Sequence, residues 1–161
     1  MIGADQHEGE PNRAAGLVPA LEAIRLGRRA DDRTDAVEQV GRTLIDIGAV
    51  AEDYLGTMHQ REAAGSTYIG EGVAIPHGTD ESRAHVHRSA VAVVQFPEGV
   101  DWGGEDVRLC VGIAVMDSEH VSFLASLARV LIVPDQAERL RSARDARSII
   151  QILRSTVSNR S

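Results

Sequence analysis

Two nearly continuous runs of apolar residues, 89–96 and 107–116, constrain the fold of this chain most strongly. A strand with one face in water alternates apolar and polar residues, whereas a strand covered on both faces is apolar almost throughout. We therefore predict two central strands of a sheet. Between them, residues 97–104 are rich in glycine and acidic side chains, which indicates a loop that joins the strands in a hairpin-like connection.

Apolar residues recur at helical spacing in the segments that flank these strands. Thr34 is a candidate cap for the first helix, Gly48 ends it, and Asp117 or Ser118 can cap the helix that stops before Pro134. We expect helices over residues 34–47, 51–62, 117–133, 135–142 and 145–156. Aromatic residues make up only 3% of the chain, so a core of aliphatic side chains is expected, which favours the α/β class.

The length of 161 residues, with 43% hydrophobic residues, is enough for one domain with a substantial core. Residues 1–16 are polar and rich in glycine and acidic groups, so they cannot bury enough apolar area to offset chain entropy. We predict a flexible N-terminal tail over 1–16 and a single domain over 17–161.

The formal net charge of -7 argues against a polynucleotide partner, because the phosphodiester backbone would be repelled. All basic residues are arginines, and no basic run is interleaved with aromatic residues. The single cysteine, Cys110, excludes an intramolecular disulfide and a thiolate metal cluster, and its apolar neighbours place it in the core. Without a leader or a long apolar run, we expect a cytoplasmic protein that does not insert into membranes.

His77 is the strongest candidate for chemistry. Pro76 restricts Ile75 to extended geometry, and Gly78 removes a side chain that could crowd the imidazole. We therefore expect His77 to be displayed rather than buried, as a nucleophile requires. The alternative is a histidine in a turn at a strand end, without a chemical role.

Two further residues could help to bind an anion beside His77. His120 lies in the first turn of an expected helix, where free N–H groups favour an anion and the helix dipole keeps the imidazole neutral. Arg61 lies in the last turn of another expected helix, and its planar guanidinium can hold two phosphoryl oxygens. His120 could equally have no function, and Arg61 could simply pair with the helix dipole.

A neutral imidazole can attack phosphorus in line and pass the phosphoryl group onward. The sequence has no P-loop, no glycine-rich fingerprint and no nucleophile elbow, so a nucleotide-dependent kinase is not supported. His85 and His87 form a His-x-His pair that could bind a metal if His120 joined them, although the pattern is more typical of two surface histidines. His7 and His59 have no context that indicates chemistry.

Several motifs together resemble the mannitol-type IIA component of the bacterial sugar phosphotransferase system, a small histidine phosphocarrier. They keep the order and approximate spacing of that family from near residue 20 to about residue 131. The matching segments are 21–27, 58–62, 67–70, 74–79, 96–100, 102–103, 111–114 and 119–120. The resemblance implies a mixed β-sheet flanked by helices on both faces.

The resemblance also implies a phosphotransferase whose phosphoryl group sits on Nε2 of His77, assisted by His120 and Arg61. The other ring nitrogen should then donate to a backbone carbonyl or a similar acceptor. The donor would be the phosphocarrier HPr, and the acceptor would be a cysteine of the IIB domain, which serves mannitol uptake through the membrane IIC part. No cofactor and no metal are implied, and mannitol itself would not bind here.

Fructose-type and nitrogen-regulatory IIA domains share the Pro-His motif, so it does not select a branch of the family. Tyr68 and the segment 97–103 favour the mannitol branch. The alternative is a docking module whose phosphorylation state regulates another protein. For the phosphoryl relay we expect a small, partly apolar patch around His77 with an acidic rim that steers an arginine-bearing donor, with Glu71, Asp80 and Glu98 as candidates.

Overall fold

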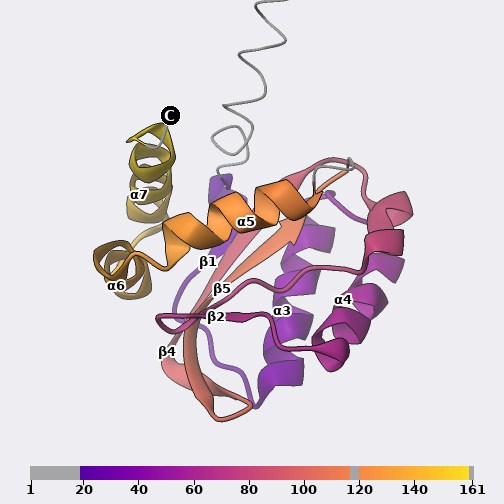
Figure 1. Ribbon diagram of the computed structural model, residues 1–161, viewed down its shortest axis with the longest axis horizontal. Helices are drawn as coiled ribbons and strands as arrows, with labels where there is room; N and C mark the ends of the chain where they lie inside the picture. Colours follow the sequence, from indigo (N-terminus) through magenta and orange to yellow (C-terminus); the bar gives the residue numbers. More distant parts are fainter. Residues whose placement is uncertain (1–18, 117–119, 160–161) are drawn as a thin grey trace, which may run out of the picture.

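Within residues 19–116 and 120–159, which the computed structural model describes, five strands form one sheet in the order β1-β4-β5-β3-β2 (Figure 1). Nothing is described for the side chains of residues 120–123 and 156–159. The strands are β1 (Ile24–Arg25), β2 (Tyr68–Gly70), β3 (Val73–Ala74), β4 (Ala90–Trp102) and β5 (Glu105–Ala114). β4 and β5 pair antiparallel, as do β2 and β3, whereas β1 with β4 and β3 with β5 are parallel pairs. The sheet is therefore mixed, as predicted.

Helices cover both faces of this sheet (Figure 1). They are α3 (Arg33–Asp46), α4 (Asp53–Ala64), α5 (His120–Leu131), α6 (Pro134–Ser142) and α7 (Ala146–Asn159), with short 3-10 helices η1 (Leu21–Ala23) and η2 (Asp80–His85). Along β4, Ala92 and Val94 pack with α3 and α4, while Val91 and Val93 pack with α5, α6 and α7. Burial on both faces explains why this run is apolar almost throughout.

The prediction of a loop over residues 97–104 is wrong for most of that segment. After an irregularity between Gln95 and Val100, the ladder resumes and continues to the pair Trp102 with Glu105. Val100 and Trp102 are buried and Asp101 is exposed. The segment therefore alternates as a strand with one face in water, a pattern that its glycine and acidic content concealed. Only Gly103 and Gly104 form the turn.

The predicted helices are found with shifted ends. The first begins at Arg33 because the carboxylate of Asp32, rather than Thr34, caps it by accepting a hydrogen bond from the Asp35 amide at 2.8 Å. α4 runs two residues later than the 51–62 predicted. Gly48 follows α3 with a φ of 79°, the left-handed conformation that glycine favours. The predicted tail at 1–16 and the cap at Asp117 or Ser118 lie outside the described residues, and the single domain over 17–161 stays a prediction.

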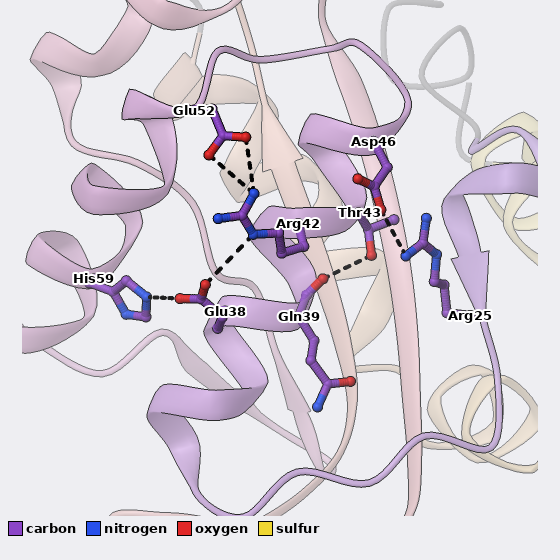
Figure 2. A network of polar contacts seen from close by, with 8 residues as sticks. All are labelled: Arg25, Glu38, Gln39, Arg42, Thr43, Asp46, Glu52 and His59. Atoms are coloured by element: carbon purple, nitrogen blue, oxygen red, sulfur yellow. Dashed lines mark hydrogen bonds and ion pairs between the residues drawn. The ribbon is translucent and has the colours of Figure 1, made fainter.

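Polar contacts join the outer surfaces of α3 and α4 (Figure 2). Glu38 contacts Nε2 of His59 at 3.0 Å and Nε of Arg42 at 3.7 Å, and Arg42 reaches Glu52 at 3.0 Å. Exposed pairs of this kind each contribute at most about 1 kcal/mol. The carboxylate of Glu38 gives His59 a hydrogen-bond partner near the surface, which agrees with setting it aside as a chemical candidate.

None of the helices within the described ranges is long and apolar enough to cross a membrane.

Candidate functional site

His77 lies beside the carboxyl end of β5. It forms an isolated parallel bridge with Ile113, and the amide of Ile113 donates a hydrogen bond to the carbonyl of Pro76 at 3.1 Å. β5 ends at Ala114, and α5 begins a few residues later at His120. The histidine is therefore held where a central strand ends and the next helix follows, a common position for ligand sites in α/β sheets.

The imidazole of His77 has a defined partner on one side. Its Nδ1 lies 2.7 Å from the carbonyl oxygen of Ile75, two residues earlier in the chain. Because a carbonyl can only accept, Nδ1 must carry the proton, and in the neutral ring Nε2 then carries the lone pair. The expected backbone acceptor for Nδ1 is thus present and is Ile75.

The expectation that His77 is displayed is wrong, because only 6% of the residue is exposed. The reason lies in Gly78. A Cβ atom there would collide with Ser82 Oγ and would lie 2.6 Å from Thr57 Oγ1 and 2.8 Å from Tyr54 Cε1. Gly78 therefore allows this segment to pass tightly against α4 and η2, rather than clearing space around the imidazole.

Tyr54, which the sequence motifs did not single out, contacts the same segment. Its hydroxyl donates to the carbonyl of Ile113 at 2.8 Å and accepts from the amide of Gly78 at 2.9 Å. In the sequence, Tyr54 is indistinguishable from an ordinary apolar position of an amphipathic helix. No sequence signal could have identified it, because both partners are distant backbone groups.

Arg61 lies in the last turn of α4, as predicted. Its Nη1 donates to the carbonyl of Gly65 at 2.7 Å, which satisfies a backbone group at the helix end. Thr57, one turn earlier on the same side of α4, lies against Gly78 together with Tyr54. The described contact of Arg61 is therefore the helix-end alternative, and its part in a phosphoryl site stays a prediction.

The side chain of His120 lies outside the described residues, although the backbone of this residue begins α5. Its approach to His77 stays a prediction.

Of the residues expected to form an acidic rim, Glu98 pairs with Arg29 at 2.8 Å on the surface, and Asp80 begins η2. Glu71 has a φ of 56° in the β2–β3 turn.

A buried carboxylate anchors the chain that leads to His77. Glu62 is 7% exposed, and its carboxylate accepts hydrogen bonds from the amide and hydroxyl of Thr67, at 2.8 and 2.6 Å, and from the Trp102 indole at 2.9 Å. The carbonyl of Thr67 in turn accepts from the amide of Ile75 at 3.0 Å. The last turn of α4 thereby positions Ile75, whose carbonyl holds the ring of His77.

The prediction that Cys110 belongs to the core is confirmed, because the residue is fully buried. Burial strongly raises the pKa of its thiol, and the negative charge of Glu62 adds to the effect. A thiol held in the neutral form is a poor nucleophile.

Among the residues that the structure describes, no group of three or more His, Cys, Asp or Glu side chains is arranged to hold a metal ion. His85 is partly buried at the end of η2 and His87 is exposed. The third member of the metal alternative, the side chain of His120, lies outside the described residues.

Comparisons with known proteins agree with this fold. The chain is 40% identical over 129 residues to the mannitol-specific phosphotransferase enzyme IIA component of Staphylococcus aureus, covering 80% of this chain and 90% of the relative. The crystal structure of Escherichia coli IIA mannitol matches with a TM-score of 0.77 and 35% identity, covering 83% of this chain and 97% of that one.

A second solved structure, the complex of Escherichia coli IIA mannitol with phosphorylated enzyme IIB, matches with a TM-score of 0.78 and 34% identity, covering 84% of this chain and 96% of that one. These results confirm the predicted resemblance to mannitol-type IIA components and the phosphotransferase class. Residues 20–156 match the family described as phosphoenolpyruvate-dependent sugar phosphotransferase system, EIIA 2. The chain therefore belongs to the EIIA type 2 family of the sugar phosphotransferase system.

Proposed function

We propose that this protein accepts a phosphoryl group from phospho-HPr on Nε2 of His77 and passes it to a cysteine of the IIB component that serves mannitol uptake. The observation that carries the proposal is the 2.7 Å contact between Nδ1 of His77 and the carbonyl of Ile75. This contact assigns the lone pair of the neutral ring to Nε2. The mannitol-specific relatives support the substrate pathway, and the IIB complex of the Escherichia coli neighbour supports the acceptor.

The proposed transfer consists of two displacements at phosphorus. The Nε2 lone pair forms a bond to phosphorus while the bond from phosphorus to the histidine nitrogen of HPr breaks. The ring of His77 gains positive charge as this bond forms, and the carbonyl of Ile75 stabilises the Nδ1 proton. In the second step a cysteine thiolate of IIB attacks phosphorus, and Nε2 of His77 leaves with its lone pair.

In this proposal Arg61 and His120 stabilise the negative oxygens of the phosphoryl group. A guanidinium can hold two oxygens at once, whereas a lysine ammonium offers a point charge. Arg61 would have to exchange its contact with the Gly65 carbonyl for the phosphoryl oxygens. We expect that Arg61→Lys and His120→Ala slow the transfer without preventing folding.

The decisive experiment incubates the purified protein with phosphoenolpyruvate and the general phosphocarrier proteins, and maps the acid-labile phosphate by mass spectrometry. We expect phosphate on His77 and none in His77→Ala. His87→Ala, at an exposed histidine, is the matched control and should accept phosphate at the wild-type rate. Unchanged phosphorylation of His77→Ala would falsify the proposal.

A chase with IIB components separates the relay from the regulatory alternative. Phosphate that moves from His77 to the cysteine of a mannitol IIB component supports the relay. Phosphate that stays on His77 in the presence of a competent mannitol IIB component argues for a regulatory docking module. Both roles would be performed in the cytoplasm, where the general phosphocarriers act.

A further inference from the structure

The hydroxyl of Tyr54 is inserted between the peptide that follows His77 and the backbone of β5. Only 2% of Tyr54 is exposed. Its oxygen donates to the carbonyl of Ile113 at 2.8 Å and accepts from the amide of Gly78 at 2.9 Å. The hydroxyl therefore binds two backbone groups around His77, and the Ser82 side chain also interacts with it.

This arrangement modifies a regular parallel pairing. In a parallel bridge between His77 and Ile113, the amide of Ile113 donates to Pro76, and the amide of Gly78 is aimed at the carbonyl of Ile113. The first bond is present at 3.1 Å. On the other side of the bridge, the Tyr54 hydroxyl links Gly78 to Ile113 by two hydrogen bonds in series. It thereby ties the peptide after His77 to the end of β5.

The direction of both bonds is determined by their partners. An amide can only donate and a carbonyl can only accept, so the hydroxyl proton must point at Ile113. Burial raises the pKa of Tyr54 to about 12, so the hydroxyl keeps that proton at neutral pH.

We propose that Tyr54 is a positioning residue for phosphoryl transfer, because it fixes the backbone on the carboxyl side of His77 while the Ile75 carbonyl holds Nδ1 on the other side. The proposal rests on the proposed function of His77 as phosphoryl acceptor. The Ile75 contact selects one tautomer, and the Tyr54 contacts hold the backbone that carries the ring, so both fix where Nε2 lies for the attack on phosphorus. An attacking atom displaced by about 1 Å can lower a rate by about a hundredfold.

The test compares Tyr54→Phe, which removes a single oxygen atom, with Tyr68→Phe. The Tyr68 hydroxyl contacts the amide of Gly72, in the β2–β3 turn, at 3.4 Å. Two quantities are measured: the rate of phosphoryl acceptance from phospho-HPr, and the tautomer of His77 by nitrogen-15 NMR of the imidazole. We expect Tyr54→Phe to lower the rate about tenfold to a hundredfold and to mix the tautomers, while Tyr68→Phe changes neither.

A folded Tyr54→Phe variant with the wild-type rate and a single Nδ1–H tautomer would overturn the positioning role. If that variant does not fold, the wild-type protein still provides a test. Phosphorylation of His77 should then shift the NMR signals of both the Gly78 amide and the Tyr54 hydroxyl proton, and an unchanged pair overturns the proposal. If the wild-type protein does not accept phosphate, the proposed function is refuted. Comparing the His77 tautomers of the wild type and Tyr54→Phe then still tests the positioning role of Tyr54.

Discussion

The indole N–H of Trp102 donates a hydrogen bond to the carboxylate of Glu62 at 2.9 Å, although 40 residues separate the two in the chain. Trp102 is the last residue of β4, and Glu62 lies in the final turns of α4. The same carboxylate accepts two hydrogen bonds from Thr67. A single buried charge therefore joins the hairpin, the helix and the segment that leads to His77.

Removing the indole donor should destabilise this junction. We expect Trp102→Phe to lower the free energy of unfolding by about 3 kcal/mol, because the carboxylate loses one of its three hydrogen bonds and the smaller ring leaves a cavity. Urea denaturation followed by circular dichroism measures this change. Glu105→Gln, at an exposed residue opposite Trp102 in the ladder, should change stability by less than about 0.5 kcal/mol. Equal stability of Trp102→Phe and the wild type would contradict the role assigned to the junction.

Adding one methyl group at Gly78 should displace the His77 segment. The new Cβ would collide with Ser82 Oγ and lie 2.6 Å from Thr57 Oγ1, so we expect Gly78→Ala to cost about 1–3 kcal/mol. Gly56→Ala is the matched control on α4, where a Cβ meets no atom within 4 Å. That change should stabilise the protein by about 0.5–1 kcal/mol through helix propensity. Thermal unfolding of both variants tests the pair, and a neutral Gly78→Ala is the contrary outcome.

Alkaline pH should destabilise the fold through Tyr54. Its pKa is raised to about 12 in the folded state, so folding favours the neutral phenol. Stability should therefore fall as the pH rises, beginning near the unfolded pKa of about 10, and the loss should reach about 2 kcal/mol at pH 12. Denaturant titrations from pH 9 to 12 measure this slope. Tyr54→Phe should remove this part of the slope and Tyr68→Phe should retain it; a wild-type slope in Tyr54→Phe would contradict the assignment.

The thiol of Cys110 should be chemically inert in the native protein. Burial raises its pKa, so little thiolate forms, and no reagent can reach it without opening the sheet. We expect Ellman's reagent to titrate no thiol in native buffer and one thiol per chain in guanidinium chloride. Rapid modification in native buffer would show that the β4–β5 core opens locally.

The side chain of Gln95 should contribute to holding the C-terminal helices. Its Nε2 lies 3.3, 3.0 and 2.9 Å from the carbonyls of Leu140, Arg141 and Ala143, at the end of α6. We expect Gln95→Leu to cost about 1–3 kcal/mol, because buried and partly buried carbonyls at the helix end lose their donor. Amide hydrogen exchange should accelerate most in α6 and α7. Gln60→Ala, at an exposed position of α4, should leave exchange in α6 and α7 unchanged.

Much of the architecture was predictable from local pattern. The runs at 89–96 and 107–116 indicated strands covered on both faces, and α3, α6 and α7 follow from helical spacing with caps and breakers. The hairpin extension through Val100 and Trp102 was missed, because its alternation is carried by few residues among glycines and acids. The two-residue strand β1 has too few residues to show any periodicity.

The amino-acid sequence alone identified the family resemblance, the mixed α/β class and the Pro-His-Gly motif, because these depend on residue types at short spacing. The tertiary structure alone decided the environment of His77: its burial, the Ile75 carbonyl at Nδ1 and the Tyr54 hydroxyl between Gly78 and Ile113. The contacts of Tyr54 join α4, β5 and the segment after β3, which are distant in the chain. Such contacts depend on how the strands and helices pack together, and no local pattern of residues encodes them.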